Sequence, residues 1–143
     1  MKEPGITMEV SADPALLGAV RGAVSCYLDA NGFSQERTSE VVLAVDEACA
    51  NAIRHAYRGQ KDRTFRLAMR ATKRWLELEV RDGGKPAPQD KIVRKGLPEI
   101  SDEKETMPGG LGIQLMYEVF DKVVFCPGKT RGNCVTLRLK RPA

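Results

Sequence analysis

The sequence predicts an α+β fold: a two-layer α/β sandwich with helices on one face of a mixed, mostly antiparallel sheet. Stretches in which apolar and polar residues alternate, as in half-buried strands, occur near the start, in the middle and at the end of the chain. Between them lie stretches with apolar residues three and four apart, as in amphipathic helices. The order is strand, two helices, two strands, a long loop, a helix and two strands. Such a pattern leaves one sheet face open to water or to a partner.

The first predicted strand carries Ile6, Met8 and Val10 alternately on one side, which predicts that this side is buried. The helix that follows should be capped by Asp13, with Pro14 at its first position. An Asn-Gly pair should end it.

The second predicted helix is the longest and runs from Ser34 to Gly59. Its apolar residues form one continuous stripe: Val41, Val45, Ala48, Cys49, Ala52, Ile53 and Ala56. We expect this stripe to anchor the helix in the core.

The remaining elements follow in order along the chain. Two strands are expected over 63–82, joined by a turn at 72–73. Residues 83–110 show little periodicity, and a loop of this length in a compact domain is uncommon unless it is functional. A short helix over 111–121 and a closing hairpin over 122–141 complete the pattern.

Composition suits one soluble domain spanning residues 1–143, with 42% hydrophobic and 29% charged residues. No apolar run approaches the roughly 18 residues that a membrane span needs, and the start of the chain has no apolar secretion segment. We therefore expect a cytoplasmic protein. The four cysteines form no C-x-x-C pair, and we expect buried thiols. Cys126 and Cys134 flank the closing hairpin, but we expect no disulfide between them.

Lysine and arginine exceed aspartate and glutamate by 23 to 19, which gives a formal net charge of +4. The charges are scattered and aromatic residues make up only 6% of the chain, unlike the clustered cations and stacking rings of a nucleic-acid reader. We expect no direct contact with nucleic acid. A basic face would equally suit an acidic protein partner or a polyphosphate ligand.

Three polar residues, Glu47, Asn51 and His55, follow one border of the long helix's apolar stripe at four-residue intervals. At about 100° per residue this row drifts only about 40° per step, so the side chains stay beside the core and partly shielded from water. The row is either a solvated helix edge, with Glu47 paired to Arg54 or another base, or part of a site. The row alone does not distinguish the two.

Two glycine-rich stretches accompany this row. Asp82 ends a strand directly before Gly83 and Gly84, and its ionised carboxylate accepts hydrogen bonds from donors such as the exocyclic amine of adenine. Gly110 and Gly112 lead into a helix, whose unpaired N–H groups favour phosphate. The alternatives are a simple turn after an edge strand and a flexible hinge with a helix cap.

The order of these three pieces resembles the GHKL, or Bergerat-fold, ATPases. "DEACANAIRHAY", "DGGKPAP" and "GGLGI" are similar to the N box and the two glycine boxes of that superfamily. Within it the chain is most similar to the compact anti-sigma factor serine/threonine kinases, the RsbW-like family. A P-loop and the catalytic loop of ordinary protein kinases are absent from the sequence.

The resemblance implies a role for each matching residue. Asn51 would hold Mg²⁺ through its amide oxygen, a hard ligand of the kind this ion takes. Glu47 would act as general base toward the attacking hydroxyl. Asp82 would bind adenine, with Gly84 beneath the ring.

Other matches are less sharply defined. Gly110 and Gly112 would bind phosphates at the end of an ATP lid of about residues 88–110. Arg54 is a further candidate for nucleotide binding, since a basic residue here contacts phosphate in some relatives. His55 would shape the border of the site.

The implied protein is a Mg-ATP-dependent kinase that phosphorylates a serine or threonine of a small anti-sigma factor antagonist. It would bind a sigma factor until unphosphorylated antagonist competes, and homodimers are usual in the family. Two alternatives stay open: a non-catalytic ATP-binding anti-sigma factor or adaptor, and a partner-switching kinase whose target is not a sigma factor. Glu47 favours a kinase, because a pure binder needs no base there.

Overall fold

The fold was determined as a computed structural model that describes residues 5–57, 63–83, 110–126 and 133–142, with the side chains of 55–57 and 110–111 left out. The strands are β1 (Gly5–Ser11), β2 (Thr64–Ala71), β3 (Trp75–Asp82), β4 (Lys122–Phe125) and β5 (Asn133–Lys140). The helices are α1 (Leu17–Ala30), α2 (Gln35–Tyr57) and α4 (Gly110–Val119), with a 3-10 turn η1 (Pro14–Leu16) before α1.

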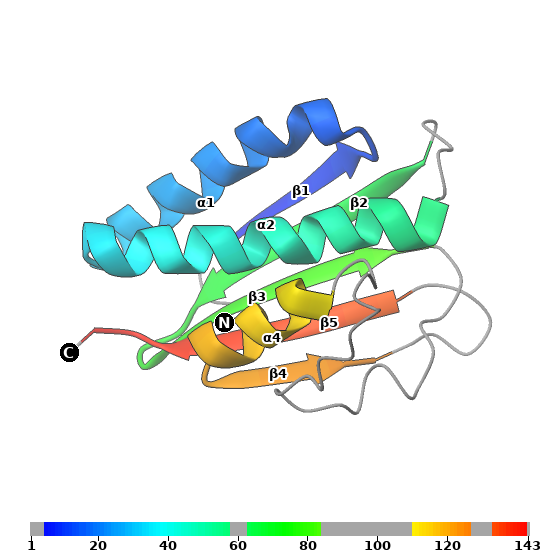
Figure 1. The fold of residues 1–143 in the computed structure, drawn as a ribbon. Coiled ribbons are helices and arrows are strands. Elements are labelled where there is room, and N and C mark those ends of the chain that lie inside the picture. The colour runs from blue at the N-terminus through cyan, green and yellow to red at the C-terminus, as the bar shows by residue number, and fades with distance from the viewer. Residues whose placement is uncertain (1–4, 58–62, 84–109, 127–132, 143) are drawn as a thin grey trace.

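The strands form one sheet in the order β1-β2-β3-β5-β4, and α2 lies between α1 and α4 on one face of it (Figure 1). This confirms the predicted two-layer sandwich and its element order. The sequence allowed for a mixed sheet, whereas each of the strand pairs within the described ranges is antiparallel. No helix in the described part of the chain is long and apolar enough to cross a membrane.

The core lies between the helices and the sheet because burial alternates along the central strands as their pleat requires. In β3, Leu76, Leu78 and Val80 are buried, while the residues between them are only half-buried. In α2, the predicted stripe is buried from Val41 to Ala52. Full burial of a single side chain such as Val41 contributes about 1.5–3 kcal/mol, so this stripe anchors α2 in the core.

Local signals set the ends of the helices. Ser34, where the second helix was predicted to begin, caps α2, its hydroxyl accepting the backbone N–H of Arg37 at 3.1 Å. Asp13 was predicted to cap the first helix, but its carboxylate accepts the N–H of Ala15 at 3.0 Å and caps the 3-10 turn instead. After α1 the chain turns at Gly32, whose φ of 87° favours glycine.

The expectation of buried thiols holds for only half of the cysteines. Cys49 and Cys134 are buried, whereas Cys26 and Cys126 are exposed. The backbone N–H of Cys126 donates to the carbonyl of Cys134 at 2.8 Å, yet both thiols are free, as predicted.

Candidate functional site

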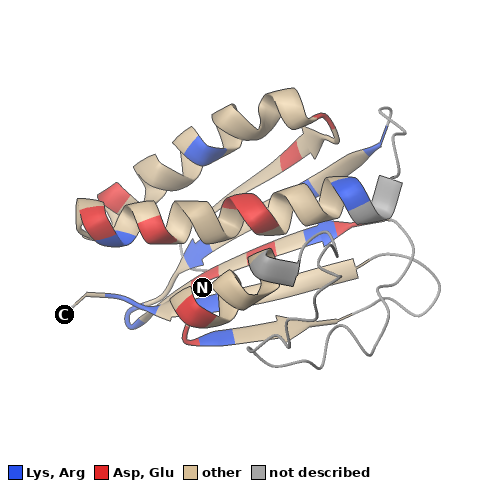
Figure 2. Ribbon diagram, in the orientation of Figure 1, with Lys and Arg blue, Asp and Glu red and all other residues tan. Residues whose placement is uncertain are grey.

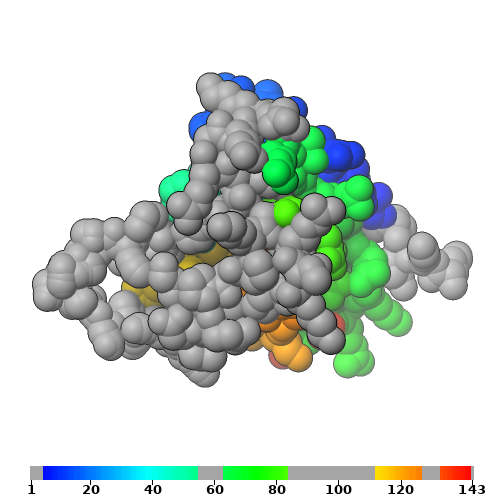
Figure 3. Space-filling model, turned by 90° about the vertical axis from the view of Figure 1, so that its right-hand side faces the viewer, coloured from blue at the N-terminus to red at the C-terminus, as the bar shows by residue number. Residues whose placement is uncertain are grey.

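The candidate residues come from four elements that meet at one end of the molecule. The C-terminal half of α2, the end of β3, the beginning of β5 and the beginning of α4 all lie there (Figure 1). Figure 3 looks onto this end, where atoms of α2, β3 and α4 reach the surface. The fold therefore gathers the helix row, the strand-end carboxylate and the second glycine motif at the same end of the sheet.

Glu47 and Asn51 lie on α2 where the sequence predicts them, on the border of the buried stripe. Both are half-buried, while the neighbouring Ala48 and Ala52 are buried against the sheet. Because packing fixes the rotation of α2, the carboxylate and the amide are held in position at the edge of the core.

Gly112, in the first turn of α4, lies directly against the side chain of Glu47. A methyl group added at Gly112 would overlap the Oε1 atom of Glu47. It would also lie 3.1 Å from the Cβ atom and 3.1 Å from the Cδ atom of Glu47. The missing side chain at position 112 thus lets α4 approach α2 this closely. This contact brings together two residues for which the sequence implied separate roles.

Arg54 contacts Asn51 and not Glu47. Its Nη2 atom donates to the Asn51 Oδ1 atom at 2.6 Å, a short bond typical of a charged donor. The alternative in which Glu47 pairs with Arg54 is therefore wrong, and no described residue forms an ion pair with Glu47. The amide oxygen of Asn51 faces a positive charge in this structure.

Asp82 ends β3 on the face that the helices cover. It has the same strand parity as the buried Val80, and it is half-buried. Opposite it in β5 is Asn133, whose Nδ2 donates to the Asp82 Oδ1 atom at 3.2 Å. The side-chain amide thus holds the carboxylate from one side.

Asn133 is a site residue that the sequence reading missed. It lies next to the closing hairpin, with no motif of its own to mark it. Only the β3–β5 register, which pairs Asn133 with Asp82, would have identified it. Register depends on how distant strands pair, and this is set by tertiary packing.

Several predicted positions lie outside the described residues: Gly84, the His55 side chain and residues 88–109 of the predicted lid. Gly110 is the first residue of α4, at the helix start where it was predicted. Within the described ranges, no cluster of three or more His, Cys, Asp or Glu side chains is arranged to hold a metal ion.

The two buried thiols, Cys49 and Cys134, are unreactive at neutral pH. Burial, assisted by the charge of Asp46, raises the pKa of the Cys49 thiol to about 12. Burial also raises the pKa of Cys134 to about 12, as does its hydrogen bond to Glu79, whose Oε2 atom accepts at 3.1 Å. Neither thiol is therefore a nucleophile at neutral pH.

Comparison with known protein families shows which family the chain belongs to. The family model described as the histidine kinase-like ATPase domain matches residues 10–139. The chain belongs to this family. Membership confirms the expected superfamily and implies that the chain binds ATP.

Relatives narrow the assignment to the RsbW type. The chain is 33% identical over 122 residues to the serine-protein kinase RsbW of Bacillus licheniformis, covering 82% of this chain and 75% of the relative. It is 31% identical over 122 residues to RsbW of Listeria innocua, covering 82% and 76%. With RsbW of Bacillus subtilis it shares 29% identity over 120 residues, covering 82% and 75%. The resemblance to the RsbW family is confirmed.

Solved structures share the fold. The crystal structure of the RsbU and RsbW domains of a Mycobacterium tuberculosis protein matches with a TM-score of 0.67 at 17% identity, covering 98% of this chain and 34% of that longer one. The SiaB–SiaC complex of Pseudomonas aeruginosa matches with a TM-score of 0.68 at 12% identity, covering 94% and 88%. The predicted helix-covered sheet is thus a fold already seen in this family.

Proposed function

We propose that the chain is an ATP-dependent serine/threonine protein kinase and anti-sigma factor in a partner-switching system. It would transfer the γ-phosphoryl group of ATP to a serine or threonine of a small anti-sigma factor antagonist, in the cytoplasm. The observation that carries the proposal is Glu47, a carboxylate one helical turn before Asn51 at the end of the molecule where the ATPase motifs gather, in a chain similar to named serine-protein kinases.

Glu47 is suited to the role of general base. It is half-buried, no described residue pairs with its charge, and the backbone of Gly112 limits where its carboxylate can turn. An unpaired carboxylate held in place can accept the proton of an attacking hydroxyl, an effect worth about 10²–10⁴ in rate.

Asn51 is the candidate ligand for Mg²⁺. The ion takes oxygen ligands and keeps several waters, so one amide oxygen together with ligand phosphates satisfies it. The Asn51 oxygen already accepts a cationic donor from Arg54, which fits a position that favours positive charge. When bound, the ion would neutralise phosphate charge during transfer. Arg54 would have to release this oxygen and would then be free to bind a phosphate.

Asp82 is proposed to bind adenine, and Asn133 would hold the Asp82 carboxylate in place through its 3.2 Å hydrogen bond. Gly84 would lie beneath the ring and Gly110 beside the phosphates, at the end of a lid of about residues 88–110. Transfer would rest mainly on positioning and on charge neutralisation, as in other phosphoryl transfers.

The proposed partners are the antagonist, a sigma factor that the protein binds until unphosphorylated antagonist competes, and a second copy of the chain in a homodimer. A protein with the same fold was solved as the SiaB–SiaC complex, which supports binding of a protein partner by this architecture. The second candidate function is a non-catalytic ATP-binding adaptor, which a nucleotide site without phosphotransfer would also suit.

Phosphotransfer tests the proposal. The protein is incubated with labelled ATP, Mg²⁺ and a small antagonist encoded by a neighbouring reading frame, beside the variants Glu47→Ala and Asn51→Ala. We expect wild type to label the antagonist, Glu47→Ala to bind ATP without transfer, and Asn51→Ala to lose nucleotide binding. If wild type binds ATP but labels no antagonist, the adaptor is supported. Normal transfer by Glu47→Ala would refute the role of the base.

A further inference from the structure

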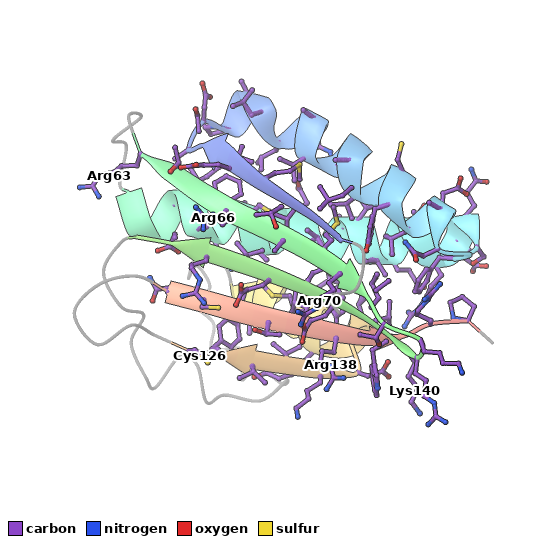
Figure 4. All side chains as sticks on the ribbon, turned by 180° about the vertical axis from the view of Figure 1, so that it is seen from behind. Arg63, Arg66, Arg70, Cys126, Arg138 and Lys140 are labelled. Carbon is purple, nitrogen blue, oxygen red and sulfur yellow. The ribbon has the colours of Figure 1, made fainter. Side chains whose placement is uncertain are left out.

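Figure 4 looks onto the sheet face that no described helix covers, where Arg66, Arg70, Arg138 and Lys140 lie. Side chains alternate along each strand, so the register fixes which of them lie on this face. Its cations are Arg66, Arg70, Arg81, Lys122, Arg138 and Lys140, and its acids are Glu9, Glu77 and Glu79. The strands therefore give this face three more cations than acids.

Four of these charged residues form one line across the sheet, which we call the basic row. Arg70 lies opposite Glu77, Glu77 opposite Arg138, and Arg138 opposite Lys122, on the strands β2, β3, β5 and β4. Three spacings between strands, each about 4.8 Å, make the row about 14 Å long. Figure 2 shows Lys and Arg at the same end of the sheet, on the β2–β3 hairpin and the start of β4.

The single acid of the row is shared, so the row keeps an excess of positive charge. Glu77 forms an ion pair with Arg70, and its second oxygen lies 3.9 Å from the Arg138 Nε atom. That Nε atom is buried and has no hydrogen-bond partner among the described residues. No described carboxylate lies within ion-pair distance of the ammonium groups of Lys122 and Lys140.

Trp75 holds one cation of the row, Arg138, and one beside the row, Lys140. The Arg138 guanidinium lies over its ring at 4.4 Å from the centroid, and the Lys140 ammonium lies at 6.0 Å. Stacking of this kind holds a long cationic side chain in one orientation. Less conformational entropy is then lost when that side chain binds a carboxylate.

The basic row is remote from the candidate nucleotide site. The row crosses β3 at Glu77, five residues before Asp82, so about 17 Å separate the two along the strand. The row also lies on the face opposite to that of Asp82. A partner bound here would leave the nucleotide end accessible.

We propose that the basic row, together with Trp75 and Lys140, docks an acidic helix or strand of a partner protein. A helix with glutamates one turn apart repeats its carboxylates about every 6 Å and can reach several cations of the row. This inference is independent of the proposed kinase activity, since it rests only on the charges of the sheet face.

Other occupants fit the face less well. Nucleic acid fits less well because its bases stack on free aromatic rings, and the Trp75 ring is already stacked by Arg138. In a symmetric dimer formed through this face, two positively charged surfaces would meet and repel each other. Membrane binding would need exposed apolar side chains. This face has few of them, one of which is Val124.

The test uses the whole protein and a labelled peptide with glutamate at every fourth position between alanines. Fluorescence anisotropy measures the affinity, and the fluorescence of Trp75, the single tryptophan of the chain, reports whether the peptide reaches this face. A peptide with glutamine in place of glutamate is the control. We expect the glutamate peptide to change the Trp75 emission and the glutamine peptide to leave it unchanged.

Variants locate the surface. The double variant Lys122→Gln, Lys140→Gln keeps the stacking of Arg138 and should weaken peptide binding about fivefold or more. The matched double variant Arg63→Gln, Arg66→Gln removes the same charge from the far end of β2 and should change affinity less than twofold. Thermal unfolding of both variants confirms that they fold.

Three results would overturn the proposal. One is failure of the glutamate peptide to bind, and another is equal weakening by the two double variants. The third is that Trp75 responds to single-stranded DNA, to anionic vesicles or to protein concentration, but not to the peptide.

Discussion

Gly112→Ala tests the packing of α4 against Glu47, because it sets two effects of opposite sign against each other. Alanine is favoured over glycine within a helix by about 0.5–1 kcal/mol. At Gly112, however, the new methyl group would overlap the Glu47 Oε1 atom and lie 3.1 Å from its Cβ and Cδ atoms. Rotation of the carboxylate relieves only part of this crowding, since the Glu47 Cβ is fixed to the backbone of α2.

Overpacking of this kind costs about 1–3 kcal/mol. We therefore expect Gly112→Ala to lower the free energy of unfolding by about 1 kcal/mol, or roughly 3 °C in Tm for a chain of this size. Urea unfolding followed by circular dichroism measures the change. The matched control is Gly22→Ala in α1, where an added methyl group meets nothing within 4 Å. That variant should gain about 0.5–1 kcal/mol.

A double-mutant cycle isolates the contact with Glu47. Glu47→Ala removes the Oε1 and Cδ atoms, so Gly112→Ala should cost at least about 1 kcal/mol less in that background than in wild type. The reasoning is refuted if Gly112→Ala stabilises the protein as much as Gly22→Ala does. It is equally refuted if the cost of Gly112→Ala is unchanged by Glu47→Ala.

Three further predictions concern the nucleotide end and the thiols. Asn133→Ala should weaken ATP binding about threefold to tenfold in calorimetry, because Asp82 loses one charge-assisted hydrogen bond, and unchanged affinity would contradict this role. Iodoacetamide at pH 8 should label Cys26 and Cys126 in the folded protein, as mass spectrometry of the intact chain would show, and labelling of a buried thiol would be the contrary result. Since the pKa of Cys49 is raised from 9.0 to about 12, the unfolded state loses this proton first and stability should fall as pH rises above 9. Cys49→Ala should reduce that dependence in urea titrations and leave the share due to Cys134, and an equally steep dependence would contradict the assignment.

The periodicity of apolar residues was sufficient to predict the elements and the border position of Glu47 and Asn51. Both depend on the angle between residues on one helix, and this is a local property. The same arithmetic would have corrected one error. Cys26 lies about 200° around α1 from the buried Val24, and it is exposed.

Contacts between distant elements could not be predicted in this way. The partner of Arg54 is an exception, because Asn51 lies three residues away along α2 and Glu47 seven, so helix spacing already favours Asn51. The contact of Gly112 with Glu47 depends on where α4 docks, and the partnership of Asn133 with Asp82 depends on strand register. Each is set by tertiary structure, about which a single sequence carries no local signal.

The most direct test of the proposed kinase is the single-turnover rate of phosphoryl transfer by Glu47→Gln at saturating Mg-ATP. Glutamine keeps the shape of the side chain and removes its basicity, so the contact with Gly112 is retained. We predict that the transfer rate to the antagonist falls at least about a hundredfold, while the affinity for ATP stays within about threefold of wild type. A transfer rate equal to that of wild type would contradict the account.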